Sequence, residues 1–156
     1  IELSGDKNIT ITPGKKVIFY VQGDILSTGN GGIKHDCSEA ETGVTCEPTD
    51  VQIFAYNTSK SKNPQICLKG NSRLDAFIFA PDYLIGKTAD VQYYGSIWGK
   101  SWGKIANCGS NNISSNPPSY SFEQKGQWSS LYNNLKPAVP LPKIGQVTNW
   151  REVPIN

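Results

Sequence analysis

The hydrophobic positions in the first third of the chain fall into short runs that are typical of β-strands. The run Val17–Val21 is continuous in β-branched and aromatic residues, and a second run covers Val51–Tyr56. Turn residues, Pro13-Gly14 and Gly23-Asp24, bound the first run on both sides. Runs of this length and type, separated by glycine and proline, predict strands and not helices. The pattern therefore predicts an all-β chain.

A glycine-centred motif then recurs at short intervals between residues 66 and 105. Gly70, Gly86 and Gly103 are separated by 16 and 17 residues, and β-rich runs, Ala76–Pro81 and Val91–Trp98, lie between them. This interval is too short for a domain. It suits one coil of a β-solenoid, which buries its apolar side only by stacking on neighbouring coils. We therefore expect a single-stranded, right-handed β-helix (β-solenoid) that presents an outward surface.

The pattern changes after residue 109. Residues 111–121 contain few apolar side chains and two adjacent prolines, which predicts a loop, and residues 127–135 have the spacing of one short helix at most. Residues 136–156 are rich in proline, which is excluded from central strands. We expect one domain: a solenoid body over residues 1–109 with a polar insert at 34–50, and residues 110–156 packed on it as a loop, a short helix and a proline-rich strap.

Composition narrows the possible partners. The 156 residues include 18% charged side chains and carry a formal charge of +2, so bulk charge does not favour nucleic acid or a membrane surface. No stretch approaches the roughly 18 consecutive apolar residues of a membrane span. The chain has no methionine, even at position 1, which indicates a processed or excised fragment. We expect contact with a membrane only through a missing N-terminal segment.

Four cysteines, an even number without C-x-x-C spacing, favour two disulfides and an oxidising compartment. Three pairings are possible from the sequence. We favour Cys37–Cys46, which would close the polar insert, and Cys67–Cys108, which would tie the repeat tract to the residues after it. The alternative is four buried thiols in a cytosolic protein.

Several of these segments resemble a bacterial family. Phe77–Asp82, Gly86 and Tyr94–Ser101 resemble the β-helical ectodomains of large pilin-like surface proteins, and Gly14–Ile25 is similar to an earlier element of that family. Val147–Pro154 is similar to the ending of cyanobacterial members linked to pili and exported polysaccharide. The resemblance implies a non-enzymatic, extracellular or cell-surface domain that acts in adhesion, pilus function or polysaccharide export. Its partners would be other pilus or cell-surface subunits.

One strand offers a candidate binding surface. Strict alternation over residues 94–105 places the small residues on the inward face and Tyr94, Ser96, Trp98, Lys100, Trp102 and Lys104 on the outward face. Exposed tryptophan rings are platforms for sugars or nucleobases, and lysine adds a hydrogen-bond donor or a phosphate contact. This predicts, as an alternative function, a glycan- or DNA-binding module. If the C-terminal strap covers Trp98 and Trp102, these residues are ordinary core instead.

A third and less favoured function is a polysaccharide-cleaving β-helix enzyme. Arg73, Asp75, Asp82 and Asp90 come from successive predicted coils, and hydrolysis needs two carboxyl groups roughly 5–9.5 Å apart. Asp82 follows Pro81 and Asp90 precedes a strand, so both are typical of turns. We therefore assign no catalytic residue.

The sequence also argues against a metal or a cofactor. His35 is the only histidine, and no serine in a nucleophile-elbow context accompanies it. The gap between Cys37 and Cys46 departs from zinc-ligand spacings, so His35, Cys37 and Cys46 are not expected to bind zinc. The insert holds oxygen ligands of the kind that Ca²⁺ prefers, but without the D-x-D-x-D-G pattern of a calcium loop, and a solvated loop is expected. These acidic residues are Asp36, Glu39, Glu41, Glu47 and Asp50.

Overall fold

The computed structural model describes residues 1–57, 64–69, 73–87, 92–105, 108, 113–114 and 122–123. Within these residues the regular structure consists of strands and two 3₁₀ turns, which confirms the all-β expectation. The first strands are β1 (Glu2–Leu3), β2 (Asn8–Thr10), β3 (Val17–Val21), β4 (Ile25–Ser27) and β5 (Gly32–Lys34). The turns η1 (Cys37–Glu39) and η2 (Pro48–Asp50) follow, and then β6 (Val51–Ala55), β7 (Gln65–Leu68), β8 (Arg73–Lys87), β9 (Gln92–Ile105), β10 (Ile113–Ser114) and β11 (Phe122–Glu123).

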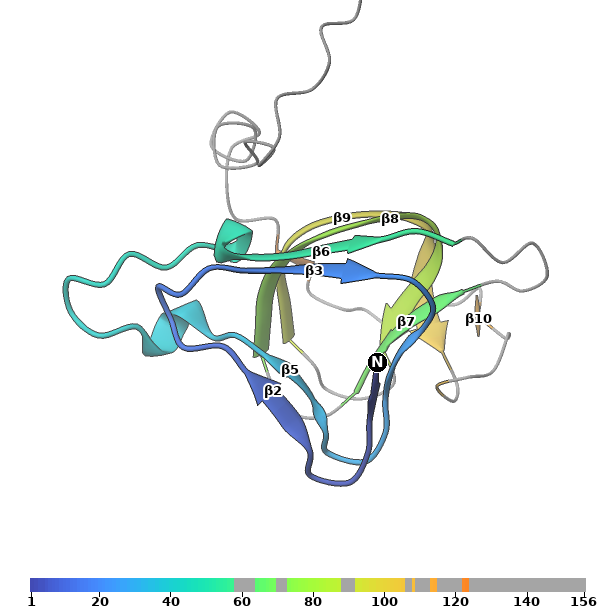
Figure 1. The fold of residues 1–156 in the computed structure, drawn as a ribbon, viewed down its shortest axis with the longest axis horizontal. Coiled ribbons are helices and arrows are strands. Elements are labelled where there is room, and N and C mark those ends of the chain that lie inside the picture. Colours follow the sequence, from blue (N-terminus) through green and yellow to red (C-terminus); the bar gives the residue numbers. More distant parts are fainter. Residues whose placement is uncertain are drawn as a thin grey trace, which may run out of the picture.

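Most of the strands belong to one curled sheet in which neighbours run parallel, apart from β10, which pairs with β9 antiparallel. β3, β6 and the first part of β8 pair in register, and β4 pairs with β1 on one side and β7 on the other. The second part of β8 pairs with β7, and β9 follows β8 along both of its parts. β2 and β5 form a separate parallel pair. In Figure 1 the chain encloses a three-sided outline, with β3 and β6 on one side and β2 and β5 on another.

The sheet curls because β8 and β9 each turn a corner along their length. The register between them shifts where β8 passes from Ala80 to Leu84, and Pro81 and Asp82 are exposed there. Before the corner Ala76, Ile78 and Ala80 are fully buried, and after it Tyr83 and Ile85 are fully buried. The inward face therefore changes from even to odd positions at the corner. One long strand thus contributes to two sides of the molecule.

The enclosed core is built from side chains that stack from strand to strand. Ile25, Ile66 and Ile85 have no exposed surface and are register partners in β4, β7 and β8. Tyr93 is also inside, and its hydroxyl donates to the carbonyl oxygen of Ala76 at 2.6 Å. Burial raises the pKa of the Tyr93 phenol well above its ordinary value, because the phenolate would lose its hydration. The core is therefore closely packed around this ring.

Only part of the predicted glycine repeat coincides with strand register. Gly86 and Gly103 are register partners, which confirms the interval of 17 residues. The other register partner of Gly86 is Cys67 and not Gly70, so the prediction that the 16 residues from Gly70 to Gly86 make one coil was wrong. The register follows the buried side chains, Ile66 against Ile85, because their packing is what the stacked strands must match.

Both favoured disulfides are formed, Cys37–Cys46 and Cys67–Cys108. Two disulfides are consistent with an oxidising, extracellular environment. No helix among the described residues is long and apolar enough to cross a membrane. The predicted helix at 127–135 and the strap at 136–156 lie outside the described residues.

Candidate functional site

Four aromatic side chains form a continuous ladder across the outside of the curled sheet. Tyr20 in β3 is the register partner of Phe54 in β6, Phe54 is paired with Phe79 in β8, and Phe79 with Trp98 in β9. Ring centroids lie 5.7 Å apart for Tyr20 and Phe54, and these two rings are nearly parallel. The next separations are 6.3 Å for Phe54 and Phe79 and 5.9 Å for Phe79 and Trp98. We call Tyr20, Phe54, Phe79 and Trp98 the aromatic ladder.

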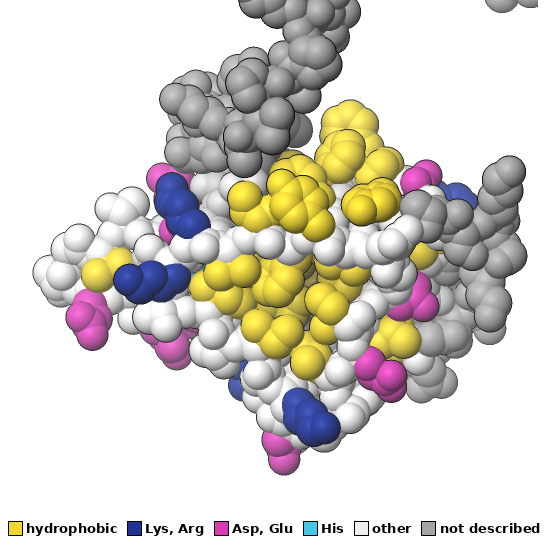
Figure 2. Space-filling view, viewed as in Figure 1, with side chains coloured by type: hydrophobic (Ala, Val, Ile, Leu, Met, Phe, Trp, Pro, Cys, Tyr) yellow, Lys and Arg dark blue, Asp and Glu magenta, His cyan; other side chains and the backbone are white. Residues whose placement is uncertain are grey.

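The ladder is exposed to solvent at both ends. Tyr20 keeps 67% of its surface exposed and Trp98 keeps 58%, with Phe79 at 38% and Phe54 half-buried between its neighbours. Figure 2 shows hydrophobic side chains projecting along the side of the molecule where β3 and β6 lie. Exposed apolar side chains scattered singly are normal, but a contiguous row of rings is a candidate binding surface.

The row of side chains on one side of the ladder is uncharged. This row, two residues earlier in each strand, consists of Ile18, Gln52, Phe77 and Ser96, which are again register partners. The turn η2 of the polar insert packs against β8 and β9 near this row, and Phe77 and Gln52 are buried. The Gln52 amide donates to the carbonyl oxygen of Thr49 in η2. The insert therefore forms one border of the ladder.

The predicted pair of outward tryptophans is not formed. Alternation holds from Tyr93 to Lys100, but beyond the corner Trp102 is the register partner of the buried Ile85. Trp102 packs against the core, with its ring 6.1 Å from that of Tyr93. The expectation that Trp102 shares an outward face with Trp98 was wrong. The reason is the corner, which reverses the inward and outward positions in β9 as it does in β8.

The other members of that predicted face are placed differently from one another. Lys100 is exposed, two residues after Trp98. Tyr94 is half-buried beneath a cation, because the Arg73 guanidinium carbon lies 3.8 Å from the centroid of its ring. Lys104 is the register partner of Lys87, and its side chain lies outside the described residues. Of the five predicted ligand-binding residues, Trp98 is the one that belongs to the aromatic ladder.

The carboxylates proposed for catalysis are not brought together among the described residues. Asp75 is 1% exposed, and its two oxygens accept from the Arg73 guanidinium at 2.9 and 3.1 Å. Asp82 is exposed at the corner of β8, and Asp90 lies outside the described residues. A carboxylate held by an arginine in this way serves as a structural ion pair. The geometry therefore supplies no support for an acid–base pair of Asp75 and Asp82.

The acidic residues of the polar insert stabilise its turns. Asp36 accepts from the backbone N–H of Ser38 at 2.9 Å and lies 3.3 Å from Arg73, while Asp50 accepts from the backbone N–H of Glu47 at 3.0 Å. Carboxylates commonly accept the unpaired N–H groups at the start of a helical turn. The expected solvated loop is thus a pair of capped turns closed by a disulfide.

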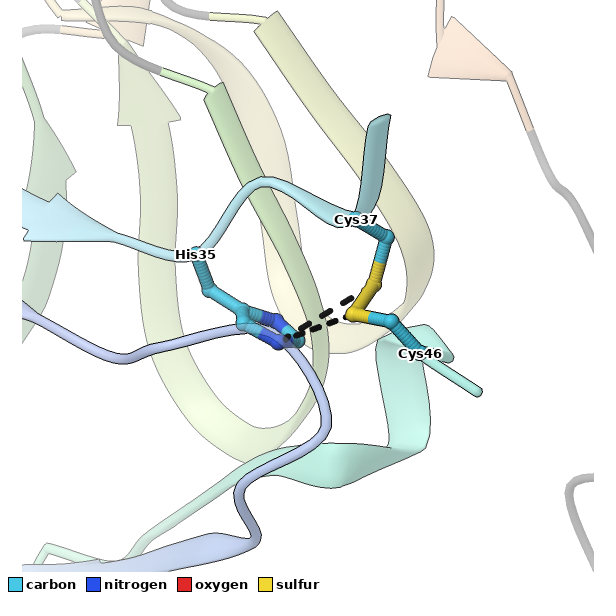
Figure 3. Close-up of side chains that lie close together, drawn as sticks. All are labelled: His35, Cys37 and Cys46. Carbon is cyan, nitrogen blue, oxygen red and sulfur yellow. Dashed lines mark hydrogen bonds between the residues drawn. A yellow bond between two sulfur atoms is a disulfide. The ribbon is translucent and has the colours of Figure 1, made fainter. Parts of the chain in front are cut away.

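A second cluster lies at the start of the insert. His35 has no exposed surface, and Figure 3 shows its ring directed at the Cys37–Cys46 disulfide. Its Nε2 atom lies 3.3 Å from Sγ of Cys46 and 3.9 Å from Sγ of Cys37. On the other side of the ring, Nδ1 lies 2.6 Å from the carbonyl oxygen of Asp75. These three potential metal ligands lie within 4.8 Å of one another, although their sequence spacing argued against a metal site.

The sequence did not reveal the ladder because its members come from four strands. Tyr20, Phe54, Phe79 and Trp98 are separated by loops of very different length, so no fixed interval connects them. One signal was available: in each of the three earlier strands the aromatic residue stands immediately before Val21, Ala55 or Ala80. Those residues are buried, so each preceding aromatic points outward.

Comparison with known proteins gives a family and no further relatives. A family model described as a domain of unknown function, DUF7305, matches residues 1–110. No curated protein and no solved structure matches the chain.

Proposed function

We propose that this chain, which belongs to the DUF7305 family, is a non-enzymatic β-solenoid ectodomain of a pilin-like surface protein that binds polysaccharide through its aromatic ladder. The observation that carries the proposal is the row of four rings in register on the outside of the sheet, three of them exposed and Phe54 half-buried. The resemblance of Tyr94–Ser101 and its neighbours to pilin-like ectodomains supports the location. Two disulfides support an extracellular site of action.

The parallel register supports the finer fold. β4, β7, the second part of β8 and the second part of β9 stack on one side, while β3, β6 and the first parts of β8 and β9 stack on another. Stacking of successive chain segments with loops of different length between them is how a β-helix is built, and crossovers between parallel strands of one sheet are right-handed in nearly all proteins. The partners expected of such an ectodomain are other pilus or cell-surface subunits.

The chemistry of the ladder favours a neutral sugar chain over DNA. Aromatic faces bind the apolar faces of sugar rings, and a row of rings at regular strand spacing can contact successive sugars of one chain. DNA binding draws most of its affinity from cations that neutralise phosphates. The row on one side of the ladder consists of Ile18, Gln52, Phe77 and Ser96 and contains no cation, while Lys100, two residues after Trp98, adds a single cation on the other side. Adhesion to, or export of, a polysaccharide fits this surface.

The test is a binding titration of the full chain with cellohexaose, maltohexaose, alginate and a single-stranded DNA oligonucleotide. We expect binding to at least one of the neutral sugars and a loss of about tenfold in affinity for Trp98→Ala, which removes one rung. Val44→Ala is the matched control, because Val44 is 41% exposed in the polar insert and is not part of the ladder. Binding of DNA alone, or equal sugar affinity for Trp98→Ala and Val44→Ala, would contradict the proposal.

The surface location has its own test. Antibody labelling of intact cells is expected to detect the domain, and the coding sequence upstream of Ile1 is expected to contain an apolar helix with a prepilin-type cleavage site. A signal peptide without such a helix would support an extracellular location and would contradict the assignment to a pilin-like protein.

A further inference from the structure

His35 carries a buried nitrogen to which no described residue offers a hydrogen-bond donor while the disulfide is formed. Its Nδ1 atom faces the carbonyl oxygen of Asp75 at 2.6 Å, and a carbonyl oxygen can only accept, so Nδ1 carries the hydrogen. In the neutral ring Nε2 then holds a lone pair. The described atoms facing Nε2 are the sulfurs of Cys37 and Cys46, which carry no hydrogen while they are bonded to each other. A buried acceptor in this position is costly unless something pairs with it.

The surroundings hold the ring and one cysteine in place independently of the disulfide. The backbone oxygen of Asp75 orients His35, and its carboxylate accepts from the backbone N–H of Cys37 at 2.6 Å. Arg73 in turn fixes that carboxylate with two hydrogen bonds. A histidine that donates its other ring N–H to a carbonyl, with its neighbours fixed by further hydrogen bonds, is the usual arrangement around a metal-ligating imidazole.

We propose that the reduced form of this cluster binds a thiophilic divalent cation, with Zn²⁺ as its test ion, through Nε2 of His35 and Sγ of Cys37 and Cys46. Imidazole nitrogen and two thiolates are ligands that zinc prefers, and three protein ligands leave a fourth position for water. Two thiolates on one zinc ion with bonds of about 2.3 Å lie about 3.8 Å apart, so the sulfurs must move apart once the bond between them is broken. Residues 41–45 of the insert are exposed and can follow this movement.

The chemical steps balance with a thiol reductant. A dithiol attacks one sulfur of the Cys37–Cys46 bond and then closes to its own disulfide, so that two electrons and two protons pass to the protein and leave two thiols. The cation then takes the lone pair of Nε2 and displaces both thiol protons into solvent. Oxidation by a disulfide reverses both steps and releases the ion. The cluster is thus a redox-gated metal site, separate from the aromatic ladder and independent of the proposed function.

The experiment compares oxidised and reduced full chain. A trialkylphosphine reduces the protein, being oxidised to its phosphine oxide with water as the source of protons, and is removed before Zn²⁺ or Co²⁺ is added. We expect one equivalent of metal bound only after reduction, sulfur-to-cobalt charge-transfer absorption, and protection of Cys37 and Cys46 from iodoacetamide by Zn²⁺. Cys67 and Cys108 serve as internal controls, and their alkylation is expected to be unchanged by the ion.

His35→Gln tests the nitrogen ligand and is expected to weaken Zn²⁺ binding at least tenfold, because even outer-shell changes alter metal affinity about 10- to 100-fold. Three results would overturn the proposal. They are equal metal binding by oxidised and reduced protein, equal affinity of His35→Gln and wild type, and equal alkylation of Cys37 and Cys46 with and without Zn²⁺. If the reduced chain unfolds by far-ultraviolet circular dichroism and Zn²⁺ does not restore the spectrum, the proposal also fails.

Discussion

Gly95→Ala should show how closely β9 rests on β8. Gly95 has φ of +130°, and a Cβ atom at this position would lie 2.0 Å from the carbonyl oxygen of Ala76 and 3.1 Å from Cβ of Pro48. The unfavourable backbone conformation costs about 1–3 kcal/mol, and forcing a methyl group against fixed backbone costs about another 1–3 kcal/mol. A gain of about 0.4–1 kcal/mol from the stiffer unfolded chain offsets part of this. We expect a net loss of about 3 kcal/mol in the free energy of unfolding.

A second glycine separates the two contributions. Gly43 has φ of +89°, and a Cβ atom added there would meet no atom within 4 Å, so Gly43→Ala carries the backbone cost without the collision. We expect it to lose about 1 kcal/mol. Urea denaturation of both oxidised variants, followed by tryptophan fluorescence and compared at a common m-value, measures the difference. If the two variants agree within about 0.5 kcal/mol, the close approach of Gly95 to Ala76 does not exist and the register of β8 and β9 needs revision.

Two further predictions concern the core and the disulfides. Tyr93→Phe removes the hydrogen bond to Ala76 and should lower stability by about 1–2 kcal/mol at neutral pH. Burial raises the pKa of the Tyr93 phenol in the folded state. The contribution of the neutral phenol to the free energy of unfolding is therefore complete below the unfolded pKa of about 10, and it is lost as the pH rises through the folded pKa. Tyr93→Phe should accordingly lose less stability than wild type when urea denaturation is repeated at increasing alkaline pH. Steeper alkaline loss in the variant would refute this. The Cys67–Cys108 disulfide closes a loop of 41 residues, so replacing both cysteines by serine should cost about 4 kcal/mol of stability. The Cys37–Cys46 disulfide closes a loop of 9 residues, and the same replacement there should cost about 2.5 kcal/mol. Urea denaturation that gives the reverse order would contradict this prediction.

The local sequence pattern was sufficient to predict where strands lie, but it was insufficient to predict which side chains of a strand face the core. Val17–Val21 and residues 51–55 were predicted because their composition is local information, and both are strands. The place of Trp102 could not be predicted, because the corner that turns it inward arises from how β9 stacks on β8. A strict two-residue alternation assumes a strand that does not bend.

In the candidate sites, too, local features could be predicted from the sequence and long-range contacts could not. Their short separation favoured the pairing of Cys37 with Cys46 among three possible pairings, and the structure contains it. The contact of His35 with Asp75 does not follow from sequence, since 40 residues separate them and an isolated bridge between His35 and Leu74 brings them together. Long-range contacts of this kind depend on the whole stack, and single-sequence patterns do not encode them.

The aromatic ladder divides the proposed binding surface into separate rungs, one for each ring. Each ring belongs to a different strand, so a substitution removes one rung and leaves the others on intact backbone. Contacts that one polymer makes along such a row act as linked sites, and affinity then rises with each added rung much more steeply than a sum of independent sites would. The number of stacked strands that carry an aromatic ring would in this way set the length of polymer that the domain binds. Related domains with more or fewer rings would then bind longer or shorter stretches of the same polymer, although each single contact would have the same chemistry.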